Sequence, residues 1–210
     1  MVQKPAAAAT QNARKPRQVE ILRRAAEVFR GRGFHRASME EIAERLGMTK
    51  GNLYYYFPGK QDLLFFCQQE ALARLTEQAR TIVAGRGSCA EKLERLITAH
   101  LVCVLVELGG SLAHAEFEEL PALQRRRIGT QRDRYEQFFR DLIHQGVASG
   151  EFAPGDDKLR TLAILGALNW TVKWHRPEGG ESATAIAHSF CDLLVHGLLQ
   201  TVPAKRKPTP

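Results

Sequence analysis

The sequence is poor in the residues that crosslink a protein or hold a metal ion. Its 210 residues include four cysteines, and no two of Cys67, Cys89, Cys103 and Cys191 form a C-x-x-C pair. Metal sites usually need ligands in pairs at short spacing, and disulfide scaffolds need a higher density of cysteine. We therefore expect buried or incidental thiols, with no metal site and no cofactor. A redox switch is the alternative reading of these thiols.

Long apolar runs are also missing. The best stretch, Leu101 to Leu108, contains Glu107 and falls well short of the roughly 18–20 residues that a membrane helix needs. No apolar segment follows the basic residues near the N-terminus, so we do not expect a secretory signal. Hydrophobic residues make up 44% and charged residues 25%, values typical of a globular chain. We expect a cytoplasmic protein that buries a substantial core.

The positive charge is confined to one end of the sequence. Residues 1–60 hold 12 Lys+Arg and 5 Asp+Glu, a surplus of seven, whereas residues 61–210 hold 18 of each sign. A basic segment ahead of a neutral body is typical of a module that meets a polyanion. Nucleic acid and an anionic membrane surface both fit this pattern, so charge alone does not decide between them.

Apolar residues recur at helical spacing over most of the chain, and the alternation typical of strands is absent. The pattern predicts an all-α fold of about nine helices. The expected helices are Ile21–Phe29, Ser38–Leu46, Lys50–Phe57, Lys60–Val83, Ala90–Leu108, Leu112–Glu119, Pro121–Ser149, Asp156–Trp174 and Glu181–Thr201. We expect residues 1–16 to form a disordered basic arm and residues 202–210 a disordered tail.

One segment carries the signals of two short helices joined by a tight turn. Ser38 and Glu41 have the S-x-x-E spacing of a capping box, which predicts where the first helix begins. Gly47 suits the left-handed residue that ends it, and Thr49 is a good N-cap for the next helix. Met48 is expected to pack beneath the turn. This arrangement is a helix-turn-helix, whose second helix can enter a major groove of DNA.

The second of these helices offers side chains suited to reading bases. Leu53 and Phe57 are expected to face inward, which leaves the polar and aromatic positions for DNA. Asn52 can pair with adenine and a tyrosine ring can pack on a thymine methyl, while Lys60 can bind a phosphate. The candidate contacts are Thr49, Lys50, Gly51, Asn52, Tyr54, Tyr55, Tyr56 and Lys60. The alternative is that the three tyrosines only fill a small helical core.

From about Arg17 to Leu64 the sequence resembles the DNA-binding domain of the TetR family of bacterial repressors. The resemblance rests on G-F-H-R-A-S-M-E-E-I-A, L-Y-Y-Y-F and G-K-Q-D-L-L. It implies a homodimer with a DNA-binding module, here residues 17–62, and an effector-binding and dimerising domain, here residues 63–201. By position the family's contacts fall on Ser38, Met39, Thr49, Lys50, Asn52, Tyr54, Tyr55, Tyr56 and Lys60. Met39 departs from the family in being apolar where a polar residue is common.

The neutral C-terminal part offers helices suited to dimerisation. Small residues in the predicted Asp156–Trp174 helix permit close packing, and the last helix has an apolar stripe at helical spacing. Two such helices from each partner would form a four-helix seam with two-fold symmetry. The operator of such a dimer should be a pseudo-palindrome. The candidate dimer residues are Ala163, Gly166, Ala167, Phe190, Leu194 and Leu198.

The same part offers candidate effector residues. Arg125 and Arg132 fall at the edge of an apolar stripe, where they form either rim salt bridges or a site for the anionic part of an effector. Trp170 and Trp174 lie one turn apart, either at the dimer seam or as a pocket wall. The full set of candidates is Leu105, Phe117, Arg125, Arg132, Tyr135, Trp170, Lys173 and Trp174, with Arg176 as a further rim cation.

A second resemblance concerns this C-terminal part. R-D-R-Y-E-Q-F-F-R-D-L-I, G-A-L-N-W and W-H-R-P-E-G-G are similar to segments of TetR-type repressors of lipid or steroid catabolism. The resemblance implies an acyl-CoA thioester as the small effector. Binding of that effector to the DNA-free form would release the repressor from its operator.

Three other functions explain the sequence less well. An enzyme is not indicated, because seven histidines form no H-E-x-x-H pattern and neither a G-x-S-x-G elbow nor a P-loop occurs. His100, His114 and Glu116 would meet only by chance of folding. A sequence-nonspecific nucleoid-type protein would explain the charge but not the neutral C-terminal domain. A membrane-surface module would not explain the capped glycine turn.

Overall fold

The structure is a computed structural model that describes residues 20–29, 31–108, 117–176 and 178–199. In these ranges the fold is all-α with eight α-helices, which confirms the predicted class. The helices are residues 20–29, α2 (Met39–Arg45), α3 (Lys50–Tyr56), α4 (Lys60–Ala84), α5 (Cys89–Val102), α6 (Ala122–Ala148), α7 (Asp157–Trp174) and α8 (Ala183–Leu194). Short segments are η1 (Cys103–Glu107), η2 (Phe117–Glu119) and η3 (His196–Leu198). The predicted arm (1–16) and tail (202–210) lie outside the described residues.

The predicted N-caps are present around the turn between α2 and α3, although the Glu41 carboxylate pairs with Arg32 and Arg45 and so leaves the predicted capping box half formed. The Ser38 hydroxyl accepts a hydrogen bond from the Glu41 backbone N–H at 3.1 Å, and the Thr49 hydroxyl accepts one from Asn52 at 3.2 Å. Gly47 has φ of 60°, the left-handed conformation that costs glycine least. These local bonds determine where each helix begins and how the two are joined.

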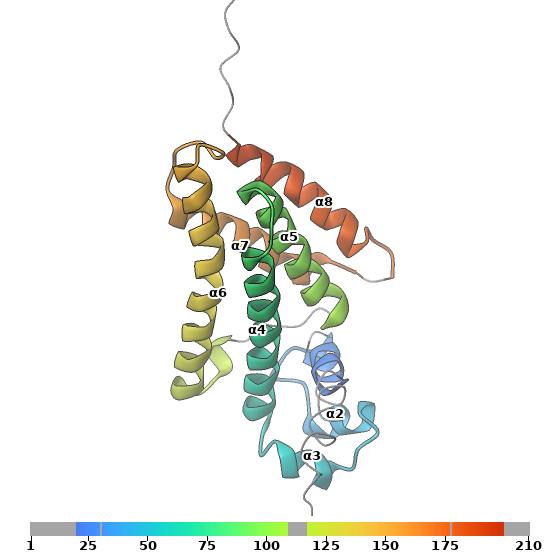
Figure 1. Cartoon of the computed structure of the whole chain (residues 1–210). Coiled ribbons are helices and arrows are strands. Elements are labelled where there is room, and N and C mark those ends of the chain that lie inside the picture. Colours follow the sequence, from blue (N-terminus) through green and yellow to red (C-terminus); the bar gives the residue numbers. More distant parts are fainter. Residues whose placement is uncertain (1–19, 30, 109–116, 177, 200–210) are drawn as a thin grey trace, which may run out of the picture.

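The helices of the molecule are arranged around α4 (Figure 1). α4 contacts both α5 and α6, and α5 in turn contacts α8. One continuous cluster of buried apolar residues runs from the N-terminal helix to η3. α3 lies at one end of the molecule and α8 toward the other, so α4 connects the helix-turn-helix to the larger helical body.

Two predicted helices end earlier than expected. After Val102 the chain forms the π-helical η1, in which Leu108 N–H donates to Cys103 C=O at 2.9 Å. α8 stops at Leu194 because the chain turns through η3, where Leu198 C=O accepts from Ala153 N–H at 2.8 Å. The prediction of a helix as far as residue 201 is therefore wrong. Of the predicted Leu112–Glu119 helix, residues 112–116 lie outside the description and the rest is the 3₁₀ turn η2.

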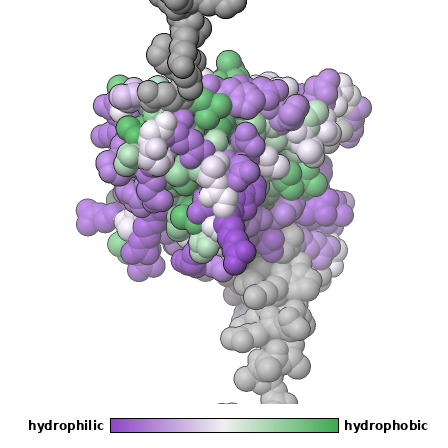
Figure 2. All heavy atoms as spheres, turned by 45° about the horizontal axis from the view of Figure 1, so that its top comes forward, coloured by the Kyte–Doolittle hydropathy of each residue, from purple (hydrophilic) through white to green (hydrophobic). Residues whose placement is uncertain are grey.

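The surface is mixed in character. With the end opposite α3 tilted toward the viewer, apolar side chains form patches separated by hydrophilic residues (Figure 2). In the part of the chain that the structure describes, no helix combines the length and apolarity needed to cross a bilayer.

Candidate nucleic-acid interface and effector region

The recognition helix α3 presents its tyrosines to solvent. Tyr55 is 82% exposed and Tyr56 58%, whereas Leu53 on the opposite side is fully buried. The Tyr55 and Tyr56 rings meet edge to face, with centroids 5.2 Å apart. The structure therefore contradicts the alternative that the three tyrosines only fill a core, since Tyr54 is also 38% exposed.

The first turn of α3 is open. Lys50, Gly51 and Asn52 are exposed, and a Cβ added at Gly51 would meet no atom within 4 Å. Lys50 forms an ion pair with Glu40 of α2, and this bond raises the pKa of Lys50 and lowers the pKa of Glu40. A DNA phosphate would compete with Glu40 for the Lys50 ammonium.

Lys60, at the start of α4, already has partners within the protein. Its Nζ donates to the backbone oxygens of Phe34 and His35, at 2.9 and 3.0 Å, and lies 4.9 Å from the centre of the Phe34 ring. An ammonium group has three N–H donors, so one is left for a phosphate. Lys60 thus fixes the loop before α2 as well as carrying charge at this surface.

Two predicted contacts at the start of α2 contribute to the fold. Ser38 is half-buried and its hydroxyl is used in the cap, while the Met39 side chain is only 3% exposed. We assign the Met39 side chain to the core, where its apolar character is explained.

Contacts of η2 and α6 with His35 and with the first turn of α4 join the two predicted domains. Glu119 of η2 pairs with His35 at 2.9 Å, and its backbone oxygen accepts from Gln61 Nε2 at 2.9 Å. Gln124 of α6 donates to Asp62 at 3.0 Å. α4 also runs without interruption across the predicted boundary between residues 62 and 63.

One group of predicted effector residues lies where η2 meets α6. The Arg132 guanidinium lies 4.1 Å from the centre of the Phe117 ring and 3.4 Å from Gln68 Oε1. Burial lowers the pKa of Arg132 to about 10, which leaves it charged at neutral pH. Arg125 forms an ion pair with Glu118 at 2.6 Å, as the salt-bridge alternative expected.

Two more predicted effector residues are buried deeper in the helical body. Leu105 is 4% exposed and Tyr135 is 4% exposed. Tyr135 is hydrogen-bonded to His100, at 3.0 Å between Oη and Nδ1. The sequence suggested only that His100 would meet His114 and Glu116 by chance, and those two lie outside the described residues. The spacing of His100 from Leu93, Leu96 and Ile97, which places it on the buried side of α5, was the signal that could have found it.

The remaining effector candidates lie elsewhere, on the exposed side of α7. Trp170 is 64% exposed, Trp174 45%, and Lys173 is also exposed. The structure therefore does not bring them together with Leu105 or Tyr135. They share their helix face with other exposed or half-buried residues, namely Leu159, Leu162, Ala163, Gly166 and Ala167.

The predicted dimer residues of the last helix are placed unequally. Phe190 and Leu194 are half-buried, and Leu193 beside them is 73% exposed. Leu198 is 8% exposed because η3 turns it into the core, so its side chain is unavailable to a partner.

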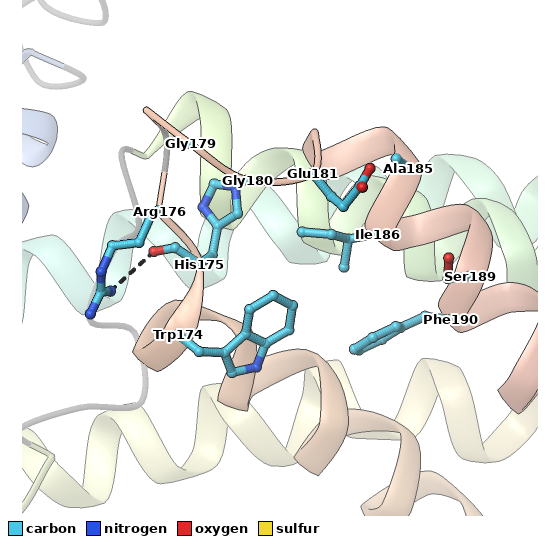
Figure 3. Close-up of a pocket in the computed structure, with 10 residues that line it drawn as sticks. All are labelled: Trp174, His175, Arg176, Gly179, Gly180, Glu181, Ala185, Ile186, Ser189 and Phe190. Atoms are coloured by element: carbon cyan, nitrogen blue, oxygen red, sulfur yellow. Dashed lines mark hydrogen bonds between the residues drawn. The ribbon is translucent and has the colours of Figure 1, made fainter.

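A pocket of about 400 Å³ lies between the end of α7 and α8 (Figure 3). Trp174 and Phe190 lie on two sides of it, with Ile186 between them. The Arg176 guanidinium at its edge donates to the His175 backbone oxygen at 3.3 Å. A predicted effector residue and a predicted dimer residue therefore line the same hollow.

The described residues contain no cluster of three or more His, Cys, Asp or Glu side chains that could hold a metal ion. All four cysteines are free thiols. Burial raises the pKa of Cys103 to about 12, which keeps this thiol protonated at neutral pH.

Two sequence models of protein families match the chain. The model described as bacterial regulatory proteins, tetR family, matches residues 21–65, and the tetracyclin repressor-like C-terminal domain matches residues 86–198. Among curated proteins, the chain is 24% identical to the fatty acid metabolism regulator protein of Bacillus subtilis, across 88% of this chain and 97% of that protein. It is also 24% identical to the transcriptional repressor KstR2 of Mycolicibacterium smegmatis, across 88% and 92%.

Solved structures show the same architecture. A TetR/AcrR regulator from Thermobifida fusca is 33% identical, with a TM-score of 0.66 across 87% of this chain and 98% of that one. AibR, solved with isovaleryl coenzyme A and operator DNA, is 27% identical, with a TM-score of 0.71 across 87% and 98%. FadR of Bacillus subtilis, solved with stearoyl-CoA, is 25% identical, with a TM-score of 0.68 across 85% and 98%.

Proposed function

Because the chain belongs to the TetR family of bacterial regulators, we propose that it is a repressor released from its operator by a small effector. In this proposal it binds a pseudo-palindromic operator as a homodimer, through α3 of each copy. Its family makes it a DNA-binding transcriptional regulator and not an enzyme.

The proposal that particular residues contact DNA rests on the exposure of α3. Tyr55 is the most exposed of its tyrosines, and Asn52 and Lys50 share the open first turn. Asn52 offers the amide that pairs with adenine, and the tyrosines offer flat apolar surface to thymine methyls. Lys50 and Lys60 supply positive charge for the flanking phosphates.

The dimer is assigned to the exposed apolar faces of α7 and α8. Trp170 of α7 is 64% exposed and Leu193 of α8 is 73% exposed. Several large apolar side chains exposed together are typical of a surface that binds a protein partner. Small residues at Ala163 and Gly166 would allow two copies of α7 to approach closely. In this proposal Trp170 and Trp174 belong to the dimer region, the alternative left open by the sequence, and the exposed Lys173 lies with them rather than at the effector. Two-fold symmetry would then place two α3 helices about 34–36 Å apart.

We place the effector site inside the helical body. The residues proposed for it are Phe117, Arg132, Leu105 and Tyr135. Apolar walls next to the Arg132 charge suit a ligand that is apolar at one end and anionic at the other. Acyl-CoA thioesters have this character, and AibR and FadR were solved with such compounds. We therefore propose an acyl-CoA thioester as the effector class.

The proposed route of release passes through α4 and η2. An effector beside Phe117 and Arg132 would act on η2, whose Glu119 bonds to His35 and Gln61 at the DNA-binding end. A ligand shifts such an equilibrium only if it binds the DNA-free arrangement more tightly. Movement of η2 would alter the angle of α4 and with it the spacing of the two α3 helices.

The test uses the full-length chain and an operator selected from random duplexes. At fixed salt, we expect the selected site to bind about 10³-fold more tightly than a scrambled site. Isovaleryl-CoA or stearoyl-CoA should release the bound DNA, and free CoA should not. Equal affinity for scrambled DNA would support the nucleoid-type alternative. Selective operator binding that no thioester reverses would overturn the effector class alone.

A further inference from the structure

An ion pair joins the two helices of the helix-turn-helix, which lie together at one end of the molecule (Figure 1). The Lys50 ammonium, on the first residue of α3, pairs with the Glu40 carboxylate, on the second residue of α2. Both side chains are open to solvent, with 61% of Lys50 and 51% of Glu40 exposed. The Lys50 Nζ also lies 5.7 Å from the centre of the Tyr54 ring, one turn later in α3. The ammonium is therefore held by a carboxylate on the surface that meets DNA in our proposal.

The surroundings of Glu40 keep its carboxylate ionised. Hydrogen bonds from Lys50 and from its own backbone N–H lower the pKa of Glu40, and the Ser38 hydroxyl contributes as well. The same pair raises the pKa of Lys50. Both groups therefore carry their full charge at neutral pH, and the two charges cancel at the first turn of α3.

Other cations at this end of the molecule also have partners within the protein. Arg32 and Arg45 pair with Glu41, at 3.5 and 3.7 Å, and Lys60 donates to two backbone oxygens. Lys50 differs from them in its position, because it is the one charged residue of α3, whose sequence is K-G-N-L-Y-Y-Y. The partner of Lys50 therefore decides how strongly the recognition helix itself is attracted to phosphates.

Binding of a phosphate by Lys50 would break the pair with Glu40. Each phosphate that a cation neutralises releases a counterion from DNA, and this release strengthens binding at low salt. When Lys50 leaves Glu40, however, the freed carboxylate remains beside the DNA backbone and repels it. The exchange of one anionic partner for another therefore gives Lys50 little net attraction to phosphate.

This restraint affects DNA without the operator sequence most. Nonspecific binding depends almost entirely on phosphate contacts, and an unpaired lysine could make such contacts in many registers of any duplex. At the operator, base contacts of Asn52 and the tyrosines would fix one register, so Lys50 would reach only the phosphates that this register presents. An unpaired Lys50 would therefore strengthen nonspecific binding more than operator binding.

We propose that Glu40 is a specificity-determining residue, which holds Lys50 back from phosphates and so limits binding to DNA that lacks the operator. The inference rests on the proposed role of α3 in reading the operator. It adds a residue that acts against the wrong DNA and needs no contact with a base.

The test compares Glu40→Gln with the wild type on the selected operator and on a scrambled duplex, at several salt concentrations. Fluorescence anisotropy with the full-length chain measures each affinity. Glu40→Gln should bind the scrambled duplex about five-fold more tightly, the size expected when an exposed ion pair is removed from each of two copies. The logarithm of this affinity should fall more steeply with the logarithm of salt concentration, by about 0.9 for each copy on the DNA. The operator should gain less, so the ratio of operator to scrambled affinity should fall.

Two further variants assign the effect to the ion pair. Glu44→Gln removes the same charge from an exposed position one turn later on α2, and so measures the effect of net charge alone. It should change both affinities less than Glu40→Gln does and leave the salt dependence nearly unchanged. In a Lys50→Met background, Glu40→Gln should affect the scrambled duplex no more than Glu44→Gln does. The substituted side chains are exposed, so thermal unfolding should find each variant close to the wild type.

Three results would overturn the inference. They are weaker binding of the scrambled duplex by Glu40→Gln, which would mean that Glu40 positions Lys50 for DNA, an unchanged ratio of the two affinities, and equal effects of Glu40→Gln and Glu44→Gln. The wild type tests the proposed function separately. Equal affinity of the wild type for operator and scrambled duplex would contradict operator reading, while the salt dependence on scrambled DNA would still show whether Glu40 restrains Lys50.

Discussion

At the scale of single residues, Tyr55 separates DNA contact from stability most clearly. Its side chain is 82% exposed, so Tyr55→Ala should leave the melting temperature nearly unchanged. If the ring packs on bases, the operator affinity should fall about ten-fold or more, corresponding to 1–3 kcal/mol for a good base contact. Fluorescence anisotropy with labelled operator measures the affinity, and thermal unfolding measures stability.

Leu53 provides the comparison on the same helix. Leu53 is fully buried, so Leu53→Ala should lower the free energy of unfolding by about 2–5 kcal/mol. This loss of stability distinguishes it from Tyr55→Ala. Unchanged operator affinity in Tyr55→Ala would show that Tyr55 does not contact the DNA.

His100 makes stability depend on pH. The unfolded chain takes up a proton on this imidazole near pH 6.5, whereas the folded chain does so only near pH 4. The unfolded state therefore binds more protons in this window, and the free energy of unfolding falls as the pH is lowered from about 6.5 to 4. The contribution is about 3 kcal/mol.

Chemical denaturation at pH 7 and pH 4.5 checks the contribution of His100. The His100→Gln variant should lose less stability than the wild type between these pH values, since glutamine does not titrate. The same loss in both proteins would show that His100 titrates equally in the folded and unfolded chains.

At the scale of elements, the first turn of α3 tests how closely its backbone approaches DNA. Gly51 has open space around it, so Gly51→Ala should keep or raise stability by up to about 1 kcal/mol. The added methyl group should nevertheless weaken operator binding if the backbone lies against the bases. Unfolding curves and anisotropy titrations of the same preparation would show the two opposite effects.

Gly129 in α6 is the matched control for this substitution. Its surroundings are equally open, and it is far along the chain from the helix-turn-helix. Gly129→Ala should raise stability without changing operator affinity. Unaltered operator binding in Gly51→Ala would mean that this backbone stands away from the DNA.

The exposed faces of α7 and α8 predict a second effect at this scale. Trp170→Glu should convert the dimer to a monomer and reduce operator binding, because a charge would be buried in the seam. Leu123→Glu is the control, since Leu123 is 63% exposed on α6 and outside this face. Sedimentation analysis should find this control dimeric. A dimeric Trp170→Glu protein would move the interface elsewhere.

Elements defined by local bonds could be predicted from the sequence, and those that depend on distant contacts could not. The Ser38 and Thr49 caps and the Gly47 turn are bonds between near neighbours, so their residue types predicted the helix-turn-helix. The early end of α8 depends on Ala153, more than forty residues away in the chain. Such a contact leaves no signal in the periodicity of α8.

At the scale of the whole molecule, the DNA-facing end was easier to predict than the effector region. The surplus of positive charge in residues 1–60 and the tyrosines of one short helix are visible in the sequence. The cluster of His100, Tyr135 and Asn169 comes from three helices, and only packing brings these residues together. For the same reason the sequence grouped Trp174 with Tyr135, although Tyr135 is buried in the core and Trp174 is exposed on α7.

The arrangement of the molecule also relates the two proposed sites. α4 extends from the DNA-binding end into the body, and η2 contacts the DNA-binding end through Glu119. An effector at the proposed site would therefore be linked to the DNA-binding end through contiguous contacts. Loss of the dimer would abolish this influence on operator binding, since one α3 helix alone reads only half a site.

The central claim is that two exposed α3 helices of one dimer read two half-sites together. The most direct measurement is hydroxyl-radical footprinting of the selected operator with the full-length protein, repeated with five base pairs inserted between the half-sites. We predict two protected half-sites about one helical turn apart on one side of the duplex, and loss of tight binding when the insertion rotates them to opposite sides. Unchanged affinity for the operator with the insertion, or uniform protection without a repeat, would contradict the claim.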